Sequence, residues 1–177
     1  MPRYAPSAAK ALEVLLWLAN EEPGIDVYHA VKSLFFADKR HVAEYGRPIV
    51  GDDYIADAWG PLPQVLYRLI RRDPLEMLAL ATNGPLPFTI DDAHRIYASR
   101  EANSRLLSPS DVEALRYGHA HVRGRSFDDI FNETHADPAY LNADGGRMDY
   151  RDFIPEDDPH REEKAADLSE VAPFAVL

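Results

Sequence analysis

Apolar side chains recur three and four positions apart along the first half of the chain, which is the period of an amphipathic helix. The pattern predicts a first helix over about residues 8–21 and a second from Val27 to Tyr45. Asp26 can cap the second helix, and Gly46 can end it because glycine adopts the left-handed conformation at low cost. The apolar stripe predicted for the second helix consists of Val27, Val31, Leu34, Phe35, Val42 and Tyr45.

The pattern changes after Gly46. Residues 52–58 predict a short extended segment, and Gly60-Pro61 predicts a break in the chain. Pro63 then opens a third helix. Its inward-facing residues are predicted to be Leu62, Val65, Leu66, Leu69 and Ile70.

The middle of the chain predicts a β-hairpin at residues 88–98, with its first strand at a sheet edge, since prolines precede it. Before it, residues 75–80 predict no more than a helical turn, and residues 82–85 predict a loop.

Capping signals define the second half. Ser108, Pro109 and Asp111 form a capping-box start for a helix that ends near Gly124. Ser126 opens a shorter helix to about residue 134, and Asp137-Pro138 starts one more turn. The inner stripe of the longer helix is Val112, Leu115, His119 and Val122, and Met148, Tyr150 and Phe153 return to the core.

Residues 156–177 differ from the rest. Asp158-Pro159 is predicted to cap a highly charged helix anchored by Leu168 and Val171, and the apolar segment 173–177 follows. Apolar surface is costly to leave in water, so we expect Phe174 and Leu177 to dock in a groove or to contact a partner. The sequence therefore predicts a mainly α single domain over residues 1–177. We expect about five to seven helices, a small β-hairpin or short sheet, and a core over about residues 8–155.

The composition narrows the possible functions. The chain contains no cysteine, which removes disulfides and thiol catalysis and fits a cytoplasmic protein. No apolar run is long enough to span a membrane. The net charge of −11 disfavours a nucleic-acid surface and favours a basic protein partner, although acidity also serves solubility alone.

Several short motifs, taken together, resemble those of a known protein family. In the first half they are LFFADKRH at residues 34–41, EYGRPI at 44–49, WGPLP at 59–63 and LY at 66–67. In the second half they are LSPSD at residues 107–111, NETH at 132–135 and PAY at 138–140. In this order and spacing the set resembles the Panacea domain, the SocA-like antitoxin family.

The resemblance implies an accessory protein that binds and neutralises a toxin, and it implies no enzyme. A variant of that role is an adaptor that delivers the toxin to a protease. The second copy of a homo-oligomer is a further possible partner. The signature residues, to which the resemblance attaches no catalytic role, are Asp38, Tyr45, Gly46, Pro48, Gly60, Pro61, Tyr67 and His135.

Candidate chemistry is sparse. Asp38 with His41, and Asp26 with His29, have the one-turn spacing that can position a general base or a metal. We interpret Asp38 as structural, bonded to backbone amides or to the Arg47 turn, and expect His135 to cap its helix or bond a neighbouring loop. The remaining histidines show no ligand spacing, so we predict no metal site, no cofactor and no catalytic residue.

Exposed aromatic and basic residues are the candidates for partner binding. Tyr54 and Trp59 lie on the short run before the Gly-Pro turn, and aromatic residues outside a core often anchor interfaces. Arg68, Arg71 and Arg72 cluster at the end of the third helix, where they suit either an acidic group or the helix dipole.

Two alternatives from other classes remain open. One is a winged helix-turn-helix DNA-binding regulator built on the second and third helices, with residues 86–98 as the wing. The other is a small metal-dependent hydrolase that uses Asp38, His41 and His135.

Overall fold

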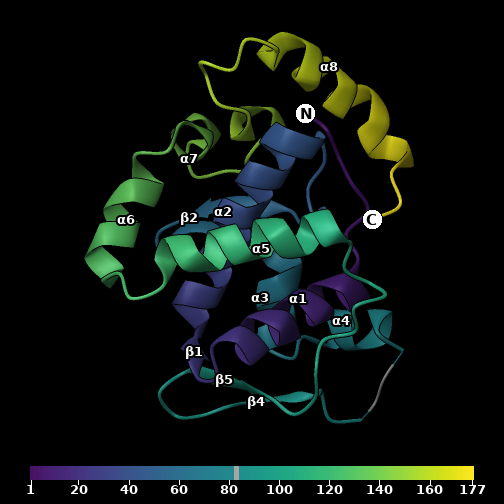
Figure 1. Ribbon diagram of the computed structural model, residues 1–177, viewed down its shortest axis with the longest axis vertical. Coiled ribbons are helices and arrows are strands. Elements are labelled where there is room, and N and C mark those ends of the chain that lie inside the picture. The colour runs from purple at the N-terminus through teal and green to yellow at the C-terminus, as the bar shows by residue number, and fades with distance from the viewer. Residues whose placement is uncertain (82–83) are drawn as a thin grey trace.

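The computed structural model describes residues 1–81 and 84–177, and helix α2 (Val27–Tyr45) lies at its centre (Figure 1). The predicted caps are confirmed: the Asp26 carboxylate accepts the backbone N–H of His29, and Gly46 has a φ of 67°. Every residue from Ala30 to Asp38 is buried, so α2 is covered on all sides and the predicted single stripe was too narrow. Tyr45 does not belong to that stripe. It is 47% exposed, because it lies in the last turn and turns its hydroxyl toward Glu113.

Helix α5 (Pro109–Val122) makes the most extensive contact with α2, and Figure 1 shows the two crossing at the centre. Gly118 permits this contact. A Cβ atom at Gly118 would lie 2.1 Å from the carbonyl oxygen of Ser33 and 2.7 Å from the backbone nitrogen of Ala37. A glycine inside a helix costs about 1 kcal/mol relative to alanine, and here the close approach of two backbones offsets that cost.

Helix α2 separates two hydrophobic cores. On one side Val31, Leu34 and Ala37 pack with α1 (Ala8–Glu21) and with α5. On the other side the aromatic residues of α2 meet side chains from distant parts of the chain. That second core includes Phe35, Phe36, Val42, Tyr54, Met148, Tyr150, Phe153 and Leu168. The predicted burial of Met148, Tyr150 and Phe153 is confirmed.

Two small antiparallel sheets flank the helices. The predicted hairpin is confirmed as β4 (Phe88–Ile90) and β5 (Arg95–Ala98), with β4 at an edge and β1 (Ile25–Asp26) on the other side of β5. The extended segment is β2 (Tyr54–Asp57), which pairs with β3 (Gly60–Pro63). Gly60-Pro61 was expected to break the chain. It instead begins β3, because a tight turn at residues 58–59 brings the chain straight back along β2.

Short helices complete the fold, which confirms the mainly α prediction. They are α3 (Gln64–Ile70), α4 (Pro74–Ala79), α6 (Phe127–His135), α7 (Pro138–Ala143) and the 3₁₀ helix η1 (Tyr150–Phe153). The described residues contain eight α-helices, against the expected five to seven. Residues 74–79 and 138–143, where only single turns were expected, form the short helices α4 and α7. Part of the predicted 82–85 loop, residues 82 and 83, lies outside the described residues.

The last helix, α8 (Arg161–Val171), precedes a 3₁₀ turn, η2 (Ala172–Phe174). Leu168 is fully buried as predicted, but Val171 is 51% exposed, because the buried face runs through Leu168 and Ala172 and Val171 lies at its edge. Asp158 does not cap α8. Its carboxylate accepts the N–H of His160 and binds Lys164 at 2.6 Å, so the helix begins two residues later than predicted.

None of the helices in the described part of the chain combines the length and apolar character needed to cross a membrane.

We expect Leu34→Ala to lower the free energy of unfolding by about 2–5 kcal/mol, because the fully buried side chain leaves a cavity. Leu78→Ala is the matched control, since Leu78 is 77% exposed and should change stability by less than about 0.5 kcal/mol. Chemical denaturation measures both. Equal losses in the two variants would contradict the central position of α2.

Candidate functional site

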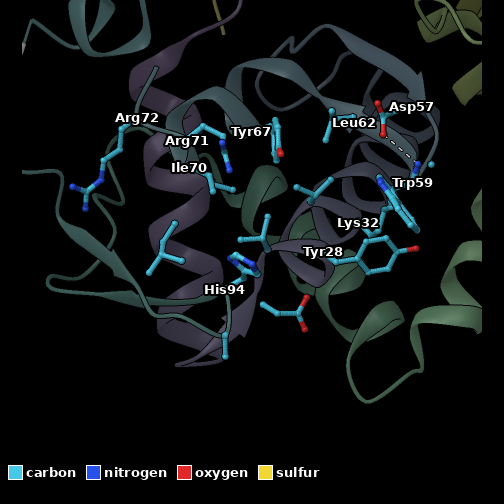
Figure 2. Close-up of a pocket in the computed structure, with 16 residues that line it drawn as sticks. Tyr28, Lys32, Asp57, Trp59, Leu62, Tyr67, Ile70, Arg71, Arg72 and His94 are labelled. Atoms are coloured by element: carbon cyan, nitrogen blue, oxygen red, sulfur yellow. Dashed lines mark hydrogen bonds between the residues drawn. The ribbon is translucent and has the colours of Figure 1, made fainter. Parts of the chain in front are cut away.

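A groove of about 1070 Å³ opens between four elements: the first half of α2, the β2–β3 hairpin, the end of α3 and the β4–β5 turn (Figure 2). Its walls combine apolar, aromatic and charged side chains. The lining residues used below are Tyr28, Lys32, Asp57, Trp59, Leu62, Tyr67, Ile70, Arg71, Arg72 and His94.

Trp59 lies at the tip of the β2–β3 hairpin, on one rim of the groove. The Asp57 carboxylate accepts the backbone N–H of Trp59 at 3.2 Å, which tightens the turn. Gly60 follows with a φ of 90°, and a Cβ there would approach the Thr134 hydroxyl to 2.8 Å. The turn therefore projects the indole outward, where it is 63% exposed and packs edge-on against Phe127 at 5.9 Å.

Lys32 forms part of the floor of the groove, and only 1% of its surface is exposed. Its ammonium donates to the Pro61 carbonyl at 2.8 Å and lies 5.0 Å from the centre of the Tyr28 ring. Burial lowers the pKa of Lys32 to about 7, against the opposing effect of the Asp57 carboxylate. This lysine ties α2 to β3 and so holds the groove floor together.

Arg71, Arg72 and His94 form the opposite rim, as Figure 2 shows. All three side chains are exposed. Arg71 and Arg72 follow the last residue of α3, and His94 ends the turn between β4 and β5. The groove thus has an aromatic rim and a basic rim, with apolar residues between them.

Two fully buried carboxyl groups position the elements of the groove. Asp38 accepts the backbone N–H of Ile49 at 2.7 Å and the Tyr54 hydroxyl at 2.8 Å. Asp52 accepts the N–H groups of Val65 and Leu66 at 2.8 and 2.9 Å, so it caps α3 from outside that helix. Burial raises the pKa of each carboxyl to about 7, and the hydrogen bonds oppose that shift.

A third buried carboxylate, Asp111, links α1, α2 and α5. It binds Lys10 at 2.8 Å, Arg47 at 3.2 Å and His41 at 3.3 Å, and it completes the predicted capping box with Ser108. Burial alone would raise the pKa of Asp111, but Lys10 and the Ser108 N–H hold it below its usual range. Burial lowers the pKa of His41.

The partner-binding candidates have different surroundings. Trp59, Arg71 and Arg72 line one groove, which the spacing of the sequence did not predict. Tyr54 was wrongly assigned to a surface, because it is 1% exposed and its hydroxyl is used by Asp38. Arg68 pairs with Glu76 at 2.7 Å and does not line the groove.

The last two candidates lie in the C-terminal segment, on a different part of the molecule from the groove. Leu177 packs against the second core, near Tyr4 and Gly51, whereas Phe174 is 83% exposed. Only Leu177 therefore docks on this chain.

The signature residues have structural surroundings. Asp38 bonds the backbone just after the Arg47-Pro48 turn, where a structural role was expected. Tyr67 lines the groove. His135 does not bond a neighbouring loop. It donates to the Phe131 carbonyl of its own helix at 2.8 Å and stacks on the Phe131 ring, because both residues lie on one face of α6.

Of the two predicted acid–histidine pairs, one is in contact and the other is not. His29 binds the Asp26 carboxylate at 2.7 Å, and this contact raises the pKa of His29. His41 does not meet Asp38. Its two ring nitrogens face the Arg47 carbonyl and the Ser110 hydroxyl. Among the residues that the structure describes, no three histidine, aspartate or glutamate side chains gather as a metal site.

Lys32, Asp52 and Gly118 were missed by reasoning from the sequence. The signal for Lys32 was its position between apolar neighbours on α2, and the signal for Gly118 was a glycine inside a helical pattern. Asp52 gave no local signal, because the helix that it caps begins twelve residues further along the chain.

A family model described as antitoxin SocA-like, Panacea domain, matches residues 31–140. The matched region begins in α2 and ends in α7, and it contains both rims of the groove. No curated protein and no solved structure matches the chain.

The raised pKa values of Asp38 and Asp52 predict how the stability of the fold changes with pH. A carboxyl whose pKa is about 7 when folded and about 4 when unfolded stabilises the fold fully below pH 4. That stability is lost as the pH rises toward 7, at no more than about 1.4 kcal/mol per pH unit. Asp38→Asn removes the titration, so the stability advantage of the parent chain over this variant should shrink between pH 5 and pH 8.

Denaturant unfolding at several pH values measures this difference. Asp52→Asn should show the same direction, since the Asp52 carboxyl is also fully buried with a pKa near 7. An advantage that grows with pH would mean that the buried carboxyl is ionised in the folded protein.

Proposed function

The chain belongs to the SocA-like Panacea antitoxin family, and from that premise we propose that it binds a toxin protein and neutralises it. The family implies a protein partner and a role other than catalysis. The mechanism we propose is occlusion, in which this chain covers the surface that the toxin uses to act. Such a protein contributes complementary surface, and it needs no cofactor.

The observation that carries the proposal is the aromatic rim of the groove. Trp59 is 63% exposed and Phe127 is 40% exposed, and the two rings are in contact. Tyr28 packs against Phe127 at 4.6 Å and extends this surface into the groove. Tryptophan and tyrosine dominate the energetic centres of protein interfaces, so this rim is the surface that we assign to the toxin.

The charge of the chain supports a basic toxin, and the absence of cysteine fits the cytoplasmic setting of the proposal. A net charge of −11 attracts a positive partner over a distance and accelerates encounter. In the adaptor variant of the proposal, a second surface hands the bound toxin to a protease. Phe174, which is 83% exposed, is the candidate contact for that step.

A DNA-binding regulator has less support. A recognition helix must present free basic residues to phosphates. Lys32 on α2 is buried, Lys39 pairs with Asp137, and Arg40 pairs with Glu44 at 2.9 Å. Helix α5 also covers α2, so this helix is not free to enter a groove of DNA. Arg71 and Arg72 form no ion pair with any described residue, but they follow the last residue of α3 and therefore do not make a basic face along that helix.

The hydrolase alternative also has less support. Asp38 is committed to Ile49 and Tyr54, and His41 is committed to Arg47 and Ser110. His135 stacks between Phe131 and Tyr140 on another part of the molecule. The three residues do not form one site.

Co-expression with the product of the neighbouring gene tests the proposal. We expect that product to arrest growth alone and this chain to restore growth by forming a complex. Trp59→Ala should weaken the complex about 30-fold, because an exposed tryptophan at an interface contributes about 2 kcal/mol or more. Calorimetry of the purified pair measures the change.

The matched control is Tyr117→Ala, which removes a 40% exposed aromatic ring from α5, outside the groove. It should leave affinity within about threefold. The proposal is wrong if the wild-type chain neither binds the neighbouring product nor restores growth.

The adaptor variant has its own test, based on two residues of the C-terminal segment. Phe174→Ala should leave stability unchanged, since the ring is exposed, and should lengthen the lifetime of the bound toxin in cells. Leu177→Ala should lower stability, because Leu177 packs against the second core. An unchanged toxin lifetime with Phe174→Ala would argue against a protease contact at this residue.

A further inference from the structure

The basic rim carries charges that nothing in the described chain neutralises. Arg71 and Arg72 are exposed and form no ion pair with any described residue, although the chain has a net charge of −11. By contrast, the neighbouring Arg68 pairs with Glu76 at 2.7 Å. The end of α3 therefore carries two unpaired guanidinium groups at the rim, with Arg71 pointing toward the groove and Arg72 outward from it (Figure 2).

The backbone at this rim provides an independent observation. Arg72 has a φ of 55° and His94 a φ of 59°, in the left-handed region that favours glycine. A side chain there costs about 1 kcal/mol relative to glycine. Both residues line the groove, whereas the other two non-glycine residues with positive φ, Ala81 and Asp144, do not. Side chains held at a conformational cost are typical of functional positions.

The acidic residues of the groove are already occupied. The Asp26 carboxylate binds His29 at 2.7 Å, and the Asp57 carboxylate accepts the N–H of Trp59 and faces Lys32. Figure 2 shows Asp57 beside Trp59, on the rim opposite Arg71 and Arg72, so the positive charge of the groove is concentrated at the rim formed by these two arginines.

The strand that borders the groove is poorly suited to pairing with a partner strand. Pro61 and Pro63 of β3 lack an N–H group, and the Pro61 carbonyl is taken by Lys32. An occupant of the groove must therefore dock through its side chains. Leu62, Tyr67 and Ile70 offer it an apolar and aromatic wall.

We propose that the groove binds an acidic segment of the toxin, with its carboxylates at Arg71, Arg72 and His94 and its apolar side chains along Leu62, Tyr67 and Trp59. This inference rests on the proposed function. It is compatible with a toxin that is basic overall. The net charge of this chain attracts such a toxin at long range, whereas the basic rim binds an acidic segment of the toxin once the two proteins are in contact. Exposed charges are screened beyond about 8 Å at physiological salt.

The test uses the purified product of the neighbouring gene and two charge-reversal variants of this chain. Arg71→Glu with Arg72→Glu should weaken the complex by about 100-fold, which counts about tenfold for each reversed contact. Arg116→Glu is the matched control. Arg116 is exposed on α5 outside the groove, so its reversal should change affinity by less than about threefold.

Arg72→Gly separates binding from folding. It removes the guanidinium and relieves the left-handed backbone, so it should bind about tenfold more weakly while the free energy of unfolding stays equal or rises. Reversal of two acidic residues of the toxin segment to arginine should restore affinity for the double-glutamate variant.

The outcomes distinguish the two proposals. If the wild-type chain binds the toxin but the double reversal binds equally well, the basic rim is not the contact and this inference is wrong. The inference also fails if a single-stranded RNA oligonucleotide binds the groove in an Arg71- and Arg72-dependent manner and competes with the toxin. If the wild-type chain binds no toxin, the proposed function itself is wrong.

Discussion

The close packing of α5 on α2 is the constraint on which the rest of the molecule depends. With α5 in contact at Gly118, one helix is enclosed along nine consecutive residues, from Ala30 to Asp38. Enclosure forces each polar side chain in that run to find an internal partner. Lys32 finds the Pro61 carbonyl, and Asp38 finds Ile49 and Tyr54. These bonds fix the β2–β3 hairpin on α2, and the hairpin supplies one rim of the groove.

The opposite rim is positioned by a different bond of the same kind. Asp52 lies just before β2, and its carboxyl accepts the N–H groups of Val65 and Leu66 in the first turn of α3. Because α3 is only seven residues long, its start determines where Arg71 and Arg72 emerge. Trp59 on the aromatic rim and Arg71 and Arg72 on the basic rim therefore come from one short stretch of chain, residues 52–72, although they lie on opposite sides of the groove (Figure 2).

Local signals in the sequence were sufficient for the helices. Asp26 and Gly46 bound α2, and Ser108 with Asp111 starts α5, because capping depends on residues three positions apart. The burial of Tyr54 and the site of Lys32 depend on contacts across 16 and 29 positions, which no local pattern encodes. The same limit applies to the groove. The sequence indicated Trp59, Arg71 and Arg72 one by one, but only the fold places them around one space.

The two carboxyl bonds restrict how the length of this chain can vary in evolution. Asp38 reaches an amide 11 positions away and Asp52 reaches one 13 positions away, and each oxygen accepts at hydrogen-bond distance. An insertion or deletion of one residue between Asp38 and Ile49, or between Asp52 and Leu66, would move an amide out of reach and leave a buried carboxyl without its partner, which is costly. Length differences should instead accumulate in residues 72–87 and 155–177, where, among the described residues, no fully buried carboxyl accepts a backbone N–H from a residue more than ten positions away. A natural sequence with the same motifs but a different number of residues between them would need other contacts in place of the Asp38 and Asp52 hydrogen bonds that position the groove.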